Sequence, residues 1–243
     1  MSADALPPHE RPDVDSLLSD LFGLNIRGAK TLGGLFANPV SVFESARIND
    51  WQLKYTPTMR LAFSILTVFS LLSFFWASEN GALYQSLLQQ VQNADGADFD
   101  SVAAKELVDA IFAGYSFAYP FAYMIFHSLI GTMVIIWGRG TSWVARIRLH
   151  FAVVSVGLSL SVASTFLMPF IRPEQVGIYT LIGVVVGLIA YVLTYIRGMS
   201  PTYSGFGLWG RGVLLSVTIT ITDFGIALIA SYAGGYWARF VVS

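Results

Sequence analysis

The chain has 243 residues, of which 55% are hydrophobic and only 12% are charged, and its mean hydropathy is +0.63. Soluble domains carry about a quarter charged residues, so this composition excludes an ordinary soluble enzyme. The 14 Lys and Arg residues stand against 15 Asp and Glu residues, which leaves no positive excess for binding nucleic acid. The absence of cysteine excludes disulfides, thiolate metal sites and a cysteine nucleophile.

The region before the first long apolar run divides into two parts. Residues 1–13 are rich in proline and acidic side chains, and we expect them to be disordered. Residues 14–58 form an amphipathic arm with a helix that begins at Asn38-Pro39, because asparagine is a frequent N-cap and proline suits the first helical position. Basic side chains lie among the apolar ones, so two interpretations stay open. The arm lies on the membrane surface, or it packs against the helices that follow.

Residues 59–243 form the predicted membrane domain. Nearly uncharged stretches, each long enough for a helix of about 20 residues to cross about 30 Å of hydrocarbon, recur along this part of the chain. Helices are favoured because they satisfy their own backbone hydrogen bonds in lipid. The sequence therefore predicts an all-α polytopic membrane protein with five transmembrane helices. The expected spans are 59–77, 117–137, 149–171, 176–196 and 213–233.

The orientation follows from the basic residues. Most Lys and Arg residues precede the first span or lie in the second and fourth loops, which places the N-terminus and the arm in the cytoplasm and the C-terminus in the periplasm. The acidic loop 78–116 then lies outside, with short helices expected over 82–92 and 101–113. All six Trp residues fall at or near the ends of the predicted spans, as expected for interfacial anchors.

Asp223 is the one charged residue deep within a predicted span, where insertion of an ionised aspartate costs about 2.5–3.5 kcal/mol. His127 occupies the middle of the second span, with Tyr123 one turn away on the same face. These two ionisable groups at matched depth form a candidate intramembrane proton or ion site, together with Tyr123 and Thr220. In the alternative interpretation, Asp223 is structural and forms hydrogen bonds with Thr220, Thr222 or a tyrosine.

The other motifs indicate no catalytic, metal-binding or nucleotide-binding site. With three histidines and no cysteine, we expect no metal site and no cofactor, and no hydrolase or ATPase motif occurs. His150, beside two arginines at the cytoplasmic start of the third span, is expected to meet lipid headgroups. The glycines of a G-x-G-x-x-G pattern join two membrane helices rather than a strand and a helix, so they predict an interfacial turn and not a nucleotide site. They are Gly205, Gly207 and Gly210.

Small residues repeat at every fourth position in two predicted spans. Gly183 and Gly187 form a G-x-x-x-G in the fourth span, and Ser155 and Ser159 continue the same spacing in the third. Small side chains let helix backbones approach closely, so we expect these two faces to pack against each other. Their use for homo-oligomerisation stays open.

The segment over residues 31–77 carries a resemblance. Its motifs lead directly into the first span and are Asn38-Pro39, Val42-Phe43-Glu44 and Lys54-Tyr55-Thr56-Pro57-x-Met59-Arg60. This stretch resembles a family of uncharacterised bacterial inner-membrane proteins, catalogued as a domain of unknown function. The resemblance implies residence in the bacterial inner membrane and supplies no catalytic residue.

Two functions are consistent with these features. The leading expectation is a non-enzymatic inner-membrane protein, an accessory or scaffold component that contacts membrane lipids and binds protein partners through its amphipathic arm. The alternative is a small proton- or cation-linked transporter or channel that uses Asp223 and His127. Access of water to Asp223 distinguishes the two, because transport requires it and a scaffold does not.

Overall fold

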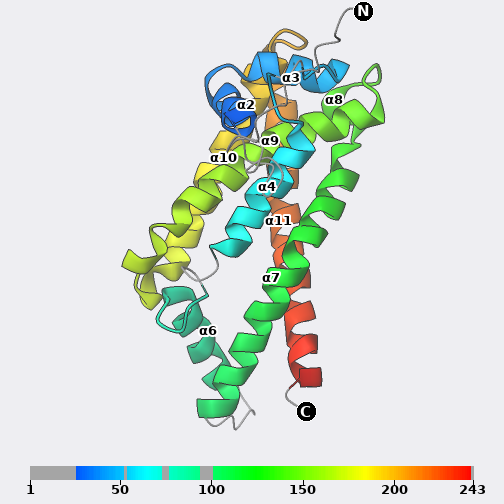
Figure 1. Cartoon of the computed structure of the whole chain (residues 1–243). Coiled ribbons are helices and arrows are strands. Elements are labelled where there is room, and N and C mark those ends of the chain that lie inside the picture. The colour runs from blue at the N-terminus through cyan, green and yellow to red at the C-terminus, as the bar shows by residue number, and fades with distance from the viewer. Residues whose placement is uncertain (1–25, 52–53, 73–76, 94–100, 242–243) are drawn as a thin grey trace, which may run out of the picture.

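The structure is a bundle of helices (Figure 1). The computed structural model describes residues 26–51, 54–72, 77–93 and 101–241, and every regular element within these ranges is helical. Three of the described helices are long and apolar enough to cross a membrane, so the chain is a helical membrane protein. These are α9 (Trp143–Thr165), α10 (Val176–Met199) and α11 (Gly205–Val241). The predicted disordered tail 1–13 and residues 14–25 of the arm lie outside the described ranges.

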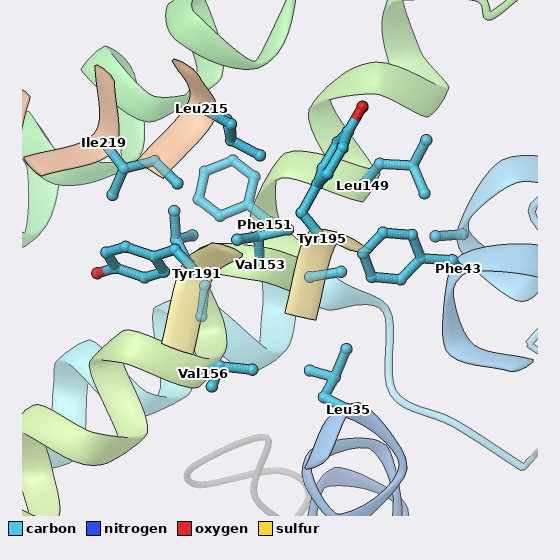
Figure 2. Packing of buried hydrophobic residues seen from close by; sticks show 14 of the residues in the cluster. Leu35, Phe43, Leu149, Phe151, Val153, Val156, Tyr191, Tyr195, Leu215 and Ile219 are labelled. Carbon is cyan, nitrogen blue, oxygen red and sulfur yellow. The ribbon is translucent and has the colours of Figure 1, made fainter. Parts of the chain in front are cut away.

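Helix α9 forms the centre of the bundle. All of its residues from Leu149 through Leu158 are buried. Helix α9 contacts α2 (Ile26–Ala37), α3 (Pro39–Ile48), α4 (Thr58–Leu71), α7 (Ser101–Gly131) and α10. Figure 2 shows Phe151 and Val153 of α9 between Tyr191 and Tyr195 of α10 and the side chains of α11. A helix that is apolar on every side is expected to lie inside a larger assembly of helices.

The start of α9 differs from the sequence-based prediction of residue 149. It begins at Trp143, where Oγ of Ser142 caps the helix by accepting a hydrogen bond from the backbone N–H of Ala145 at 3.3 Å. The prediction was placed after the last arginine, whereas the helix itself already includes Arg146 and Arg148 in its first turns. The limits of an uncharged stretch mark the hydrocarbon, and they need not mark the helix.

Helices α7 (Ser101–Gly131) and α11 lie side by side and run in opposite directions (Figure 1). At 1.5 Å per residue they measure about 45 and 55 Å, so each is longer than the hydrocarbon layer is thick. The α7 residues that face α11 include tyrosines and a histidine. These polar side chains lower the mean hydropathy of α7. This explains why α7 is not among the three most apolar long helices.

The second predicted span, 117–137, does not coincide with a single helix. The chain is already helical from Ser101, with Pro120 inside the helix, and α7 ends at Gly131. The short helix α8 (Val134–Trp137) follows and buries Ile136 and Trp137. Trp137 is therefore a core residue whose ring contacts Tyr195 at 5.3 Å between centroids, and not an interfacial anchor.

Two short helices cover one end of the bundle. α2 (Ile26–Ala37) precedes α3 (Pro39–Ile48), which begins at the predicted Asn38-Pro39 pair. The apolar face of α3 packs against α9 and α10, and Phe43 lies where a side chain on Gly198 would stand. Arg197 of α10 donates hydrogen bonds of 2.7 and 2.6 Å to the carbonyls of residues 36 and 37 at the C-terminus of α2.

The remaining elements link the long helices. α4 (Thr58–Leu71) lies along α9, and residues 73–76 of the first predicted span are outside the described ranges. Two 3₁₀ turns, η1 (Met168–Phe170) and η2 (Pro173–Gln175), join α9 to α10. The glycine motif is not a turn, because α11 begins at Gly205, which has a φ of +60°, and the other two glycines lie within its first turns.

A second small core lies where α6 (Ala82–Gln92) packs on the first turns of α7. Tyr84 and Leu88 of α6 bury against Ala104 and Val108. The helix predicted over 82–92 is confirmed, whereas the one predicted over 101–113 continues without a break into α7. Contacts with α6 and α11 support α7 beyond the apolar stretch, so the helix does not stop where the acidic residues begin.

The Tyr84 hydroxyl makes the stability of this second core depend on pH in the alkaline range. It donates a hydrogen bond of 2.9 Å to Oδ1 of Asp109, and burial together with this carboxylate raises the pKa of Tyr84 from 10.0 to about 12. The folded state favours the protonated phenol, so this contribution to stability is complete below pH 10 and is lost as the pH rises towards 12. We expect Tyr84→Phe to cost about 1 kcal/mol at pH 8 and to remove this loss between pH 8 and 11.

Thermal unfolding in detergent at both pH values measures the effect. Tyr232→Phe is the matched control, because Tyr232 is 70% exposed on α11. An equal alkaline loss of stability in wild-type protein and Tyr84→Phe would contradict the assignment.

Candidate functional site

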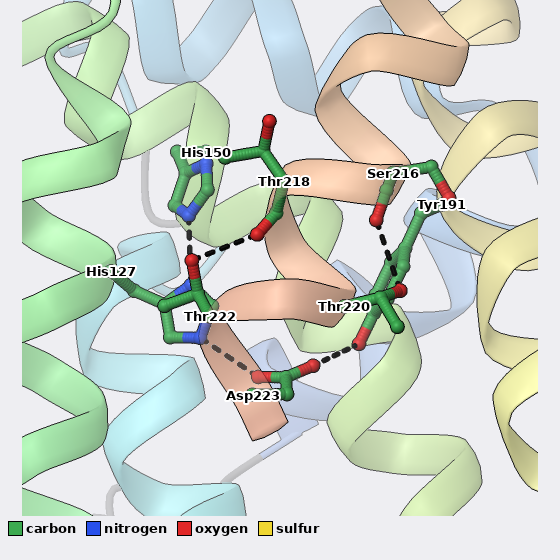
Figure 3. A network of polar contacts seen from close by, with 8 residues as sticks. All are labelled: His127, His150, Tyr191, Ser216, Thr218, Thr220, Thr222 and Asp223. Carbon is green, nitrogen blue, oxygen red and sulfur yellow. Dashed lines mark hydrogen bonds and ion pairs between the residues drawn. The ribbon is translucent and has the colours of Figure 1, made fainter. Parts of the chain in front are cut away.

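Three ionisable side chains from three helices form a hydrogen-bonded series inside the bundle (Figure 3). Nε2 of His127 on α7 lies 2.9 Å from Oδ1 of Asp223 on α11. Nδ1 of the same imidazole lies 3.0 Å from Nε2 of His150 on α9. Both histidines are fully buried, and the Asp223 side chain is 29% exposed. The structure thus brings the two predicted residues together and adds a third, His150.

Aromatic stacking and a close helix contact hold the two imidazoles in place. The Tyr123 ring is buried one turn before His127, with its centroid 4.0 Å from that of the imidazole. One turn after His127 lies Gly131, where a Cβ would stand 3.0 Å from Cα of Ile147 and 3.1 Å from Cβ of His150. The missing side chain at Gly131 therefore lets α9 approach α7 closely enough for the imidazoles to meet.

The series can hold an additional proton at any of its members without moving a heavy atom. When Asp223 is ionised, His127 donates from Nε2–H to the carboxylate, and Nε2–H of His150 donates to Nδ1 of His127. When Asp223 is protonated, its O–H donates to Nε2 of His127, and Nδ1–H of His127 donates to Nε2 of His150. The same contacts also accommodate a protonated His127 that donates from both nitrogens. The arrangement can therefore pass a proton from one end of the series to the other.

The threonines near Asp223 do not contact its carboxylate. The hydroxyls of Thr220 and Thr222 donate to backbone carbonyls one turn earlier in α11, at 3.0 and 2.8 Å. Tyr191 of α10 is the additional contact, because its hydroxyl lies 3.4 Å from Oδ2. Of the partners proposed for a structural Asp223, the structure places only a tyrosine there, and that contact is long.

A cavity of about 470 Å³ lies between α9, α10 and α11, and Asp223 is part of its wall. Thr220 and Tyr191 line the cavity beside the carboxylate, and the lining continues to Leu167, which follows α9, and to Tyr179 in the first turn of α10. Gly157 allows Tyr191 to lie against α9, because a Cβ there would occupy the position of the phenol ring. The carboxylate therefore has space beside it for water or a small molecule.

The small-residue faces do not form the predicted close contact. Gly183 is exposed, with no atom within 4 Å of where its Cβ would stand, and Gly183 and Gly187 both line the cavity. Ser155 is buried and Ser159 half-buried, and each hydroxyl donates to a carbonyl of its own helix at 2.6 Å. The spacing alone did not show that the two glycines face a cavity, of whose described lining neither serine is part.

Sequence reasoning missed His150 and Tyr191. The prediction for His150 was contact with lipid headgroups, which is wrong because α9 begins at Trp143 and carries His150 two turns into the bundle. Recognition of Ser142 as the N-cap would have provided this signal. Tyr191 is one of several tyrosines with no distinguishing pattern. Within the described residues no group of three or more metal-binding side chains occurs, and both nitrogens of His127 are already occupied.

Comparisons with known proteins give no relative: no protein-family model matches the chain, and neither the curated proteins nor the solved structures contain a significant match. The functional interpretation therefore depends on the site itself.

Proposed function

We propose that the chain is a small proton-linked transporter of the bacterial inner membrane, in which Asp223, His127 and His150 relay protons. The proposed spans are α4, α7, α9, α10 and α11, with the N-terminus in the cytoplasm and the C-terminus in the periplasm. The distribution of Lys and Arg residues along the chain supports this orientation, and the length of α7 supports its role as a span.

The observation that carries the proposal is the hydrogen-bonded series that ends at the cavity. Intramembrane ionisable groups are expensive to bury and are commonly found in proton pathways. Nδ1 of His150 is buried and has no hydrogen-bond partner among the described residues, so it is the free end of the series. A proton that arrives at this atom displaces the others along the series, and Asp223 is protonated at the cavity.

The accessory or scaffold role remains a prediction with less support. The apolar face of α3 packs against α9 and α10, and Val42, Phe43 and Ala46 are buried there. The arm would therefore bind a partner through its polar face, where Arg27 and Lys30 are exposed. A scaffold has no need of ionisable residues buried beside a cavity.

Proton flux in proteoliposomes tests the proposal. A potassium diffusion potential set by valinomycin drives protons inward, and an entrapped pH-sensitive dye reports their arrival. We expect wild-type protein to acidify the lumen and Asp223→Asn to reduce the rate at least about tenfold, because the amide cannot take up and release a proton. Thr222→Ala is the matched control, since its hydroxyl contacts only a backbone carbonyl.

The test has two contradicting outcomes. Wild-type flux no faster than in empty liposomes would overturn the proposal, and so would an undiminished flux through Asp223→Asn.

A further inference from the structure

An ionised Asp223 gives the cavity a negative charge whose one basic partner among the described residues is His127. Among the described residues that line it, Asp223 is the only charged one, and the only ion pair of Asp223 in the described part of the chain is with His127. His127 donates a hydrogen bond to the carboxylate even when the imidazole is neutral, so it does not have to neutralise it. An ionised Asp223 in a bundle of low dielectric is stabilised by a cation that enters the cavity.

The wall of the cavity is suited to an organic cation. Tyr179, Tyr191 and Phe224 line it, and aromatic faces attract ammonium groups most strongly where water is excluded. The remaining lining is largely aliphatic, including Leu160 and Ile182, which suits an apolar body attached to the charge. The volume of about 470 Å³ lies within the range of about 300–1,000 Å³ typical of small-molecule sites.

The same wall is unsuited to a hard divalent cation. Hard ions such as Ca²⁺ or Mg²⁺ are held by about six or more oxygen ligands in a compact shell. Here a single carboxylate faces the cavity, and the other side-chain oxygens of its described lining are uncharged hydroxyls of serine, threonine and tyrosine.

We propose that this cavity binds a monovalent organic cation with an ammonium group and an apolar body, and that the cation and the relayed proton compete for Asp223. The inference rests on the proposed function and names its second substrate. As the ammonium pairs with the carboxylate, the O–H proton of Asp223 passes to Nε2 of His127. The Nδ1 proton of His127 passes to Nε2 of His150, and the Nδ1 proton of His150 is released. Binding of one cation at this site therefore displaces one proton.

Benzyltrimethylammonium is a suitable probe because its charge is permanent and it has no proton to lose. Its carbon isostere neopentylbenzene has the same shape without the charge. We expect saturable binding of the cation to full-length protein in nanodiscs by calorimetry, and no saturable binding of the isostere. Measurements in two buffers of different ionisation enthalpy should show up to one proton released per bound cation.

Two glycine variants on α10 test the location. No atom lies within 4 Å of a Cβ built at Gly183, which lines the cavity, or at Gly177, which does not. Gly183→Leu should therefore fill the cavity and weaken binding by about tenfold or more, because excluded volume in a packed site is poorly tolerated. Gly177→Leu should leave the affinity unchanged, and both variants should unfold at the wild-type temperature.

The outcomes separate the two proposals. Equal binding of the cation and the isostere, or undiminished cation binding by Asp223→Asn, would overturn the inference. Proton flux through wild-type protein without any cation binding would also overturn it and would leave the relay standing. Asp223-dependent binding with proton release, but without flux in proteoliposomes, would support the cation site and contradict the proposed transport.

Discussion

Substitution of His127 by glutamine is expected to abolish proton flux while the protein stays folded, and substitution by leucine is expected to destabilise it as well. His127 bridges Asp223 and His150 at 2.9 and 3.0 Å. A glutamine amide has one donor end and one acceptor end and can replace one or both hydrogen bonds, but it cannot pass a proton along. Leucine has neither group, so it leaves the fully buried His150 without a partner on either nitrogen.

The leucine variant should lose about 1–3 kcal/mol of unfolding free energy, the usual cost of an orphaned buried polar group. The hydrogen bond lost by Asp223 adds less to this destabilisation, because the Asp223 side chain is partly exposed to the cavity and can contact water there. Thermal unfolding in detergent and dye-reported flux in proteoliposomes provide the two measurements. A glutamine variant that conducts protons at the wild-type rate would show that the relay does not pass through His127.

Substitution of Gly234 by alanine is expected to separate α7 from α11. A Cβ at this position would lie 2.5 Å from the carbonyl oxygen of Ile111 and 3.0 Å from its Cα. Both atoms belong to the backbone of α7, so no side chain can rotate away. Gly114 lies opposite in the same contact, and a Cβ there would meet the backbone of Gly234. Overpacking of this kind costs about 1–3 kcal/mol.

The neighbouring glycine provides the control. A Cβ at Gly235 meets no atom within 4 Å, so Gly235→Ala should be neutral or stabilise the helix by up to about 1 kcal/mol. The temperature of unfolding in detergent measures both variants. Equal unfolding temperatures for Gly234→Ala and Gly235→Ala would contradict the close contact between the two long helices.

The sequence determined the class of protein and much of its secondary structure. A composition with 12% charged residues and long apolar stretches requires helices in a membrane, and local signals located two short helices well. The Asn38-Pro39 pair marked the start of α3, and a short helix was expected over 82–92, where α6 lies. These features depend on residues within one or two turns of each other, which is why they can be read without a partner helix.

Helix limits were predicted less well, because they depend on contacts and not on charge. α7 begins at Ser101 within the acidic loop, where it packs on α6, and ends at Gly131, where it meets α9. α9 includes two arginines that the sequence-based boundary excluded. Only tertiary structure supplies the neighbours that extend or end such helices.

In the site, too, some features could be predicted from the sequence and others depend on the tertiary structure. The cost of a charge within a span identified Asp223 from the sequence, and matched depth suggested His127 as its partner. Only the tertiary structure decided that His150 completes the series, that Tyr191 contacts the carboxylate, and that Gly183 and Gly187 face a cavity. Residue type and spacing fix which groups share a helix face, but the rotation and separation of neighbouring helices decide which faces touch and which enclose space.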